Sequence, residues 1–440
     1  MSTGPRPLGR AAVATYGTTV LVAALSLGNV LVVGRALGPS GRGSVAFLTT
    51  VTYLVAQLAT LGIAQANVNF AGREPASTPR LATNSVLLAA AGGSLAAGLT
   101  LALMALVPAA GGPVGSGLRW LALATVPAVV LGVLLYQLAV AHFAFTASNV
   151  SSLIAPILNV TANGAFAAAG VLSIRSAVIV WLAGQLANTL FTLWYVTTRL
   201  GGWGRLDLAL ARRTLSFGLK AHIGSVLSLA NYRIDQWLMG ALTSARQIGL
   251  YSIAVSWSEA LFFLPTALAQ VQRPNLVRDD PAGAARQTAV VFRAAVVITI
   301  ALAIAVALLA PVLCTTIFGP RFADSVPQLR ILTIGSLGIV ATKLLGNALV
   351  AQGRPLRQTL AILSSFVVIL VLDVALIPSL GGVGASIASA GAYAVGGLVV
   401  VAVFARTFGL PASELVPRPS DVTALVRNAR ALARRSTAAA

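Results

Sequence analysis

The sequence contains few acidic residues, few histidines and almost no cysteine. Asp and Glu together number 10 in 440 residues, there are two His residues, and Cys314 is the single cysteine. One cysteine excludes a disulfide within the chain and a cysteine-based metal cluster. His142 and His222 lie far apart in the sequence, so a histidine-rich metal site is not expected either. The sequence therefore predicts no metal site and no bound cofactor.

Charged residues of both signs are scarce, and long apolar stretches take their place. Only 9% of the residues are charged, against ~25% in soluble domains, and the mean hydropathy is +0.89. Because lipid cannot satisfy exposed backbone groups, a membrane span needs roughly 20 mainly apolar residues in a helix. The sequence therefore predicts an all-α polytopic membrane protein with twelve transmembrane helices. The expected spans are 11–34, 44–70, 81–107, 120–141, 150–172, 176–198, 214–242, 248–271, 287–310, 328–351, 358–377 and 383–405.

Lys and Arg are distributed unevenly between the two sides of the expected membrane. With the N-terminus in the cytoplasm, 21 of the 30 basic residues fall in cytoplasmic segments and seven in outer loops, while Arg233 and Lys343 lie within helices. This positive-inside bias predicts that both termini are cytoplasmic. The net charge of +20 is attributed to this bias and to attraction to anionic membrane lipid. No basic stripe with interleaved aromatics is present, so a nucleic-acid partner is not expected.

Two halves of the chain repeat one another. The motif Leu25–Asn29 recurs as Leu227–Asn231, and the glycine that follows the first outer loop, Gly43, has its counterpart in Gly249. A constant offset of about 200–210 residues indicates duplication of a six-helix unit, which is a known signature of transporters. Two parallel six-helix lobes would allow rocking between two states. The expected divisions are a cytoplasmic N-terminus at 1–10, an N-lobe at 11–198, a linker at 199–213, a C-lobe at 214–405 and a basic tail at 406–440.

The tail has the pattern of an amphipathic helix. Val422, Leu425 and Ala429 share one face, with Arg427 and Arg430 largely opposite. This pattern predicts a helix that anchors at the membrane surface. The alternative is a frayed basic tail.

Several short motifs occur in the order found in one transporter family. They are Arg35-Ala36-Leu37-Gly38-Pro39, Phe217-Gly218-Leu219, Arg233-Ile234-Asp235, Gly249-Leu250-Tyr251-Ser252, Phe318-Gly319-Pro320-Arg321-Phe322, Gln352-Gly353-Arg354-Pro355 and Gly382-Val383-Gly384-Ala385-Ser386-Ile387-Ala388. Spread over residues 11–405, this ordered set resembles the Wzx-type polysaccharide flippases of the multidrug/oligosaccharidyl-lipid/polysaccharide (MOP) exporter superfamily.

The resemblance implies a function and a location. Such proteins move undecaprenyl-diphosphate-linked oligosaccharides from the inner to the outer leaflet of the bacterial plasma membrane by alternating access. They are not enzymes, and their partners include polysaccharide polymerases and glycosyltransferases. Asp373 stands where the family commonly has an Asn or an apolar residue.

Intramembrane charges are the first candidates for transport residues. Arg233, Asp235, Glu259 and Lys343 would each cost ~3 kcal/mol at a helix centre, so we expect them to line a wet cavity or to pair. Arg233 and Lys343 suit a diphosphate, the first through a bidentate fork and the second as a point charge. The alternative is that they only neutralise Asp235 and Glu259 in structural pairs.

Polar residues elsewhere supply further candidates. Asn29 and Asn231 occupy matching repeat positions and would contact sugar hydroxyls, or else hydrogen-bond between helices. Arg321 and Arg330 would guide anionic groups at the outer rim, or else form a solvated face. Pro127, Pro156 and Pro265 lie within expected spans and predict kinks.

The energy source is expected to be an ion gradient. The chain has no GxxxxGK nucleotide-binding loop, so a proton or sodium gradient is predicted to drive export. The candidate ion-coupling carboxylates are Glu259, Asp235 and Asp373. In one state Glu259 would pair with Lys343, and substrate phosphate would then displace it. A purely structural Glu259–Lys343 pair is the alternative.

Other functions compete with the flippase prediction. A drug or cation antiporter and a lipid II flippase belong to the same superfamily, although lipid II flippases usually carry two further helices. A membrane-embedded polymerase or glycosyltransferase would need catalytic residues in a large outer loop. The longest outer loops, 108–119 and 311–327, contain one acid between them, Asp324, which disfavours an enzyme. A scaffold without transport is disfavoured by the intramembrane charges.

Overall fold

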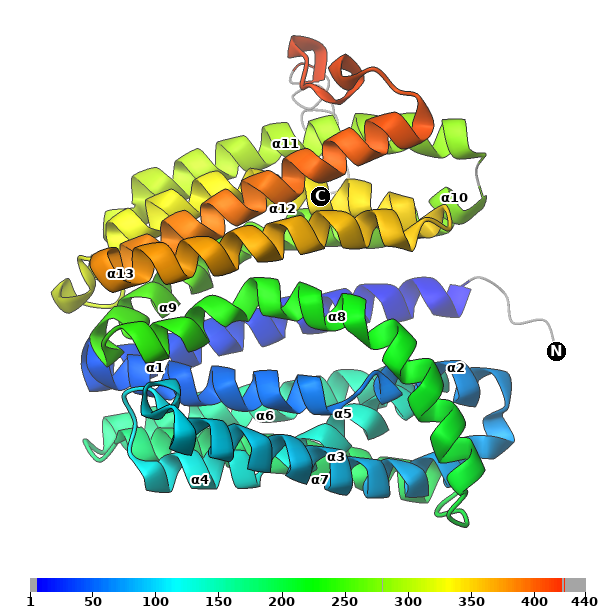
Figure 1. Ribbon diagram of the computed structural model, residues 1–440, viewed down its shortest axis with the longest axis vertical. Helices are drawn as coiled ribbons and strands as arrows, with labels where there is room; N and C mark the ends of the chain where they lie inside the picture. Colours follow the sequence, from blue (N-terminus) through cyan, green and yellow to red (C-terminus); the bar gives the residue numbers. More distant parts are fainter. Residues whose placement is uncertain (1–5, 279, 422, 424–440) are drawn as a thin grey trace, which may run out of the picture. The chain divides into compact units, whose positions relative to one another are not determined.

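The computed structural model describes residues 6–278, 280–421 and 423. Every regular element within those ranges is helical (Figure 1). The chain divides into two compact units, Met1–Ser252 and Ile253–Ala440, called the first and the second unit below. The helices of the first unit are α1 (Arg6–Ala59), α2 (Ile63–Arg73), α3 (Thr78–Leu106), α4 (Ser116–Ala124), α5 (Val126–Ala141), α6 (Phe145–Ala168), α7 (Ile174–Arg199), α8 (Leu208–Leu242) and the first half of α9 (Ala245–Ala260). The second unit contains the rest of α9, α10 (Phe263–Arg278), α11 (Pro281–Pro311), α12 (Ser325–Ala351), α13 (Pro355–Phe408) and the short helix η5 (Ala412–Leu415).

The protein is an all-α, multi-pass membrane protein. Nine described helical segments are long and apolar enough to cross a membrane. Two of them, α1 and α13, each contain two helices joined at a glycine with positive φ, 68° at Gly38 and 56° at Gly381. Both elements double back at that point (Figure 1). With α8 included, the described helices account for each of the twelve predicted spans, so the predicted fold class is confirmed.

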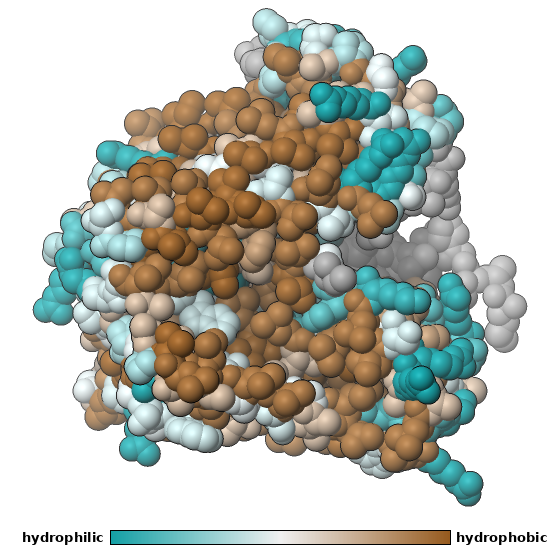
Figure 2. Space-filling model, viewed as in Figure 1, coloured by the Kyte–Doolittle hydropathy of each residue, from teal (hydrophilic) through white to brown (hydrophobic). Residues whose placement is uncertain are grey.

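Hydropathy on the surface follows the same pattern in each unit. Apolar side chains cover the middle of the helices, and hydrophilic side chains gather toward the helix ends (Figure 2). Long apolar residues such as Leu95, Leu99 and Leu398 are more than 60% exposed. Exposure of this kind is unfavourable in water but suits contact with lipid chains.

Three predicted spans are interrupted: 44–70, 120–141 and 248–271, the last of which breaks at Leu261 and Phe262, between α9 and α10. The span expected at 44–70 breaks after Ala59, because Leu61 and Gly62 adopt positive φ angles of 46° and 71° before α2 begins. A Cβ on Gly62 would lie 2.0 Å from the carbonyl oxygen of Gly218 in α8, so the close approach requires glycine. The kink predicted at Pro127 is present as a break between α4 and α5, with the proline in the first turn of α5. Pro156 lies within α6, which is not divided there, and Pro265 follows the break between α9 and α10 as the third residue of α10.

The division into compact units falls at a different place from the expected inter-lobe linker. Residues 199–213 lead into α8, and α8 packs against α1, α2 and α3 within the first unit. The six-helix lobes at 11–198 and 214–405 therefore remain a prediction from the sequence repeat. The amphipathic helix expected around 422–435 lies outside the described residues, apart from Thr423.

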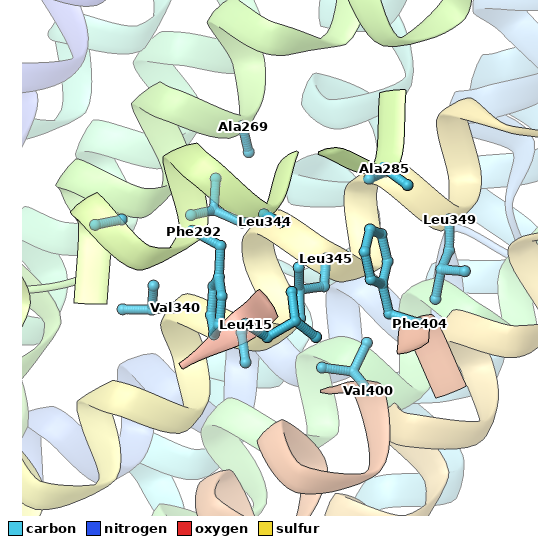
Figure 3. Close-up of a cluster of buried hydrophobic side chains, with 14 of the residues drawn as sticks. Ala269, Ala285, Phe292, Val340, Leu344, Leu345, Leu349, Val400, Phe404 and Leu415 are labelled. Atoms are coloured by element: carbon cyan, nitrogen blue, oxygen red, sulfur yellow. The ribbon is translucent and has the colours of Figure 1, made fainter. Parts of the chain in front are cut away.

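Close packing in the second unit centres on large apolar side chains. Phe292 of α11, Leu344 and Leu345 of α12, and Val400 and Phe404 of α13 point toward one another (Figure 3). Each of them is at most 6% exposed. In lipid these contacts stabilise the unit through van der Waals packing, because burial from water is not the driving force there.

Glycine pairs allow the closest helix crossings in both units. In the first unit, a Cβ on Gly43 would lie 1.7 Å from the oxygen of Ala245, and one on Gly249 would lie 1.9 Å from the oxygen of Pro39. These two glycines are counterparts in the sequence repeat, and α1 and α9 meet at them. In the second unit, α12 and α13 cross at Gly338 and Gly397 in the same way. Small residues at membrane helix crossings let the backbones approach this closely.

Candidate functional site

A polar cavity of about 420 Å³ lies inside the first unit, among α1, α2, α5, α6, α7 and α8. Most of its lining side chains are amides, hydroxyls or phenols, with one imidazole. Among the described residues that line it, none is Asp, Glu, Lys or Arg. The polar lining residues are Tyr53, Gln57, Thr60, Gln65, Tyr136, Gln137, Ser151, Ser152, Gln185, Asn188, Thr189, His222 and Ser225.

Two close contacts of α8 frame the cavity. Near the start of α8, Gly218 meets Gly62, and near its end a Cβ on Gly240 would lie 2.0 Å from the ring of Phe47. Phe47 is fully buried. The segment of α8 that lines the cavity, 222–229, lies between these contacts and near the middle of the helix. The open space extends from the middle of α7, at Gln185, to the end of α5 at Gln137 and the start of α6 at Ser151.

Hydrogen bonds fix several of the lining side chains. The hydroxyl of Ser151 donates to the side-chain oxygen of Asn188. Thr189 Oγ1 donates to the carbonyl oxygen of Ala128 at 3.0 Å. His222 Nε2 lies 3.1 Å from the carbonyl oxygen of Leu58, which can only accept, so this nitrogen carries the proton. These contacts hold part of the wall in place.

Other lining side chains keep their hydrogen-bonding capacity. Within the described part of the chain, the side-chain amides of Gln57, Gln137 and Gln185 make no hydrogen bond. Each amide offers two donor hydrogens and one acceptor oxygen. The cavity thus presents neutral donors and acceptors that are directed to whatever fills it.

Arg233 and Asp235 lie on α8 beyond the cavity, toward Gly240. The Asp235 side chain is 2% exposed. It accepts hydrogen bonds from the hydroxyl of Tyr251 in α9 and, at 2.7 Å, from the backbone N–H of Gln236. Arg233 is half-buried and donates from Nη1 to the carbonyl oxygen of Tyr232 at 3.4 Å. The carboxylate is therefore part of the α8–α9 packing of the first unit.

The remaining predicted charges belong to the second unit. Glu259 is near the end of α9, and Lys343 is in α12. Both are half-buried, and their opposite charges attract each other electrostatically. Asp373 in α13 is fully buried. Glu259 and Lys343 thus lie within electrostatic range of each other.

The predicted asparagines and rim arginines have other surroundings. Asn163 of α6 donates to the side-chain oxygen of Asn29 at 2.8 Å, which is a hydrogen bond between helices. Asn231 is buried in α8, and neither Asn29 nor Asn231 is among the described residues that line the cavity. Arg321 and Arg330 are both exposed, and Arg330 Nε donates to the carbonyl oxygen of Ala307 at 3.1 Å.

Comparison of the sequence with known families and with curated proteins gives two findings. The sequence matches the family described as polysaccharide biosynthesis protein over residues 32–327. None of the curated proteins matches the chain by sequence.

Solved structures show the same fold at low sequence identity. A lipid II flippase MurJ in an inward closed conformation superposes with a TM-score of 0.75 at 12% identity, covering 92% of this chain and 89% of that one. An inward-facing multidrug resistance MATE family transporter of the MOP superfamily gives a TM-score of 0.68 at 16% identity, covering 88% and 94%. A MATE crystal structure in the straight conformation gives 0.59 at 15% identity, covering 91% and 95%.

Proposed function

The chain belongs to the polysaccharide biosynthesis protein family, and from this premise we propose that it is a flippase for a polyprenyl-diphosphate-linked oligosaccharide. It moves this lipid from the inner to the outer leaflet of a bacterial plasma membrane during surface polysaccharide synthesis. Both termini face the cytoplasm, as the Lys and Arg distribution favours. Glycosyltransferases supply the substrate and a polymerase consumes it.

The observation that carries this proposal is the polar cavity inside a unit whose outer surface is apolar. A glycan headgroup cannot cross lipid unaided, because its hydroxyls would lose their hydrogen bonds to water. Neutral amides and hydroxyls in the cavity wall replace those bonds. A cationic drug would favour carboxylates in the wall, and the described lining residues include none, which supports the glycan over a drug or cation.

The intramembrane cations are assigned to the diphosphate. Arg233 and Lys343 provide charge-assisted hydrogen bonds, which are about twice as strong as neutral ones. Exposed Arg321 and Arg330 attract the anionic headgroup at the outer rim. The competing assignment is that Arg233 and Lys343 serve only to neutralise Asp235 and Glu259.

An ion gradient drives the cycle in this proposal. Glu259 pairs with Lys343 in one state and takes up a proton or sodium ion when substrate phosphate displaces it; Asp235 and Asp373 are the other candidate carriers. Each charge moved is worth ~2.3 kcal/mol per 100 mV. The test of this step is the rate of flipping by the Glu259→Gln variant in proteoliposomes, with and without an imposed gradient. If the rate still depends fully on the gradient, Glu259 is not the carrier.

Alternating access requires one end of the helix bundle to close while the other opens. The tight crossing at Gly43 and Gly249 lies just after the turn at Gly38 in α1 and near the start of α9, on the side that the charge distribution places outside. Because the two glycines are repeat counterparts, the crossing lies where the two six-helix lobes would meet. We assign it as the outer seal of the described state, with Asn29 serving helix packing and Asn231 remaining a substrate candidate.

A deletion strain tests the function as a whole. We expect lipid-linked oligosaccharide to accumulate in the cytoplasmic leaflet and a surface glycan to disappear. Complementation with the wild-type chain should restore the glycan, and Arg233→Ala should not. Arg286→Ala, at an exposed position in α11, is the matched control and should complement. A deletion strain with normal surface glycan and a block in lipid II export would instead favour a lipid II flippase.

A further inference from the structure

We propose that the cavity of the first unit binds neutral sugar units of the glycan and that the diphosphate binds elsewhere. This inference rests on the flippase proposal and deepens it, since it names the part of the substrate that the cavity takes. It is carried by three properties of the cavity: its unpaired amides, its aromatic walls and the absence of charge among the described lining residues.

The amides match the chemistry of sugar hydroxyls. Every sugar hydroxyl both donates and accepts, and the side chains of Gln57, Gln137 and Gln185 can do both as well. Because these amides make no hydrogen bond within the described chain, a ligand gains contacts without breaking existing ones. A site built to hydrogen-bond hydroxyls also rejects ligands that lack them, because its own polar groups would then lose their partners.

Two tyrosines add an apolar contact. Tyr53 of α1 and Tyr136 of α5 both line the cavity. An aromatic ring offers a broad apolar surface with a polar hydroxyl at its end. A sugar ring has the complementary form, with C–H groups on its faces and hydroxyls at its edge. Bare alkyl chains and inorganic ions lack this combination.

The lack of charge identifies which part of the substrate is bound. Arg and Lys are the side chains that commonly bind phosphate, and a carboxylate is the side chain that pairs with a cation. The described lining residues include neither kind of group. Uncharged sugar units are therefore favoured over the diphosphate, acidic sugars and cations. The volume of about 420 Å³ is near the lower end of small-ligand sites, ~300–1,000 Å³, so a few sugar units fit rather than a long glycan.

The test measures binding of two lipids to the purified full chain in nanodiscs. The probes are a radiolabelled undecaprenyl-diphosphate-linked neutral tetrasaccharide and undecaprenyl diphosphate without sugar. Gln185→Leu and Gln57→Leu remove the amides while keeping side-chain size. We expect each to raise the Kd for the glycan-bearing lipid about tenfold, the loss of one or two hydrogen bonds, and to leave the Kd for the bare lipid unchanged. Gln270→Leu, at an exposed position in α10, is the matched control and should change neither Kd.

A competition experiment uses the wild-type chain and needs no variant. The free neutral tetrasaccharide should raise the apparent Kd of the glycan-bearing lipid to that of the bare lipid. It should not displace the bare lipid. The proposal is overturned if the variants weaken both lipids equally, if they weaken neither, or if the free sugar displaces nothing. If the wild-type chain binds neither lipid, the flippase proposal itself fails, which is a distinct result.

Discussion

The polar cavity of the first unit and the charged side chains of the second unit differ in the kind of polar group that they present. The cavity has an uncharged wall of amides, hydroxyls and phenols among its described residues. The second unit instead places Glu259, Lys343 and Asp373 within apolar helices, with the last of them fully buried. Neutral hydrogen-bonding groups recognise sugars, whereas cations recognise phosphate and carboxylates carry protons or sodium ions.

In the proposed function, this difference corresponds to the two parts of a lipid-linked glycan headgroup. The sugar needs many weak, directional contacts, and the diphosphate needs strong charge-assisted ones. Each intramembrane charge costs ~3 kcal/mol, so keeping the sugar cavity neutral avoids a cost that sugar binding would not offset. The comparison is wrong if flipping does not need the charged side chains of the second unit, or if flipping continues at the normal rate with a charged residue in the cavity.

Loss of the α12 cation should have the largest effect. Lys343→Ala removes a charge-assisted hydrogen bond and leaves Glu259 without its electrostatic attraction to Lys343, so we expect flipping to fall about 100-fold, a loss near 3 kcal/mol. Lys343→Arg should retain much of the activity, because it keeps the charge. The Lys343→Ala protein must have normal thermal stability for this measurement. If it then flips the lipid at the wild-type rate, the charge of Lys343 in the second unit is not needed for the diphosphate.

Adding a charge to the cavity should have a smaller effect. Gln185→Glu puts a carboxylate where we expect neutral sugar, and it must be buried without a cation in the wall. We expect flipping of the glycan-bearing lipid to fall about tenfold, or ~1.4 kcal/mol. Thr198→Glu, at the exposed end of α7, is the control and should flip normally. If Gln185→Glu and Thr198→Glu flip the lipid at equal rates, an uncharged cavity wall is not required.

A third change attacks the framework of the first unit instead of its chemistry. Gly249→Ala would push a methyl group into the backbone of α1 at Pro39, and overpacking of this kind costs ~1–3 kcal/mol. The thermal stability of the purified protein should fall. Ser44, which is 5% exposed beside the crossing, should label faster when changed to Cys in this background.

The same substitution at an open position is the control. A Cβ on Gly164 of α6 would meet no described atom within 4 Å. Gly164→Ala should therefore be neutral or stabilise the protein by ~0.5–1 kcal/mol, because alanine favours a helix over glycine. If both alanine variants are equally stable, α1 and α9 do not cross as closely as described.

The smallest effect is expected at the start of α8. The backbone N–H of Leu210 donates to Asp207 Oδ1 at 2.8 Å, and Arg80 pairs with Asp207 Oδ2 at 2.9 Å. The hydrogen bond from Leu210, assisted by Arg80, lowers the pKa of Asp207 below its usual value. Because the folded-state pKa is depressed, its stabilisation is present above the unfolded-state pKa of about 3.9 and is lost as the pH falls through the folded value. Asp207→Asn should slightly lower the thermal stability at pH 7 and flatten its decline below about pH 4; parallel curves for the two proteins would contradict this.

The sequence predicted the helices well because membrane spans have a strong signal. Apolar length alone located all twelve stretches, and Gly38 and Gly381 mark the turns inside α1 and α13. The break after Ala59 was not predicted, because Leu61 is not a turn-forming residue. Its positive φ follows from the contact between Gly62 and Gly218, which are far apart in the sequence.

The cavity could be predicted only in part. Gln57, Gln185 and Asn188 are amides within apolar stretches of the sequence, and Gln185 and Asn188 share a helix face at a spacing of three residues. Tyr53, Gln137, Ser151 and Ser225 gave no separate signal, because hydroxyls and single amides are common within membrane helices. They become a site only because six helices bring them together.

The most direct test of the account is flipping by the purified chain in proteoliposomes. Vesicles would contain the undecaprenyl-diphosphate-linked neutral tetrasaccharide in one leaflet, and a glycosidase added outside would report its arrival. We predict that glycan becomes accessible faster than in protein-free vesicles and that an imposed proton or sodium gradient increases the rate. A rate equal to that of protein-free vesicles, with correctly folded wild-type protein and either gradient applied, would contradict the account.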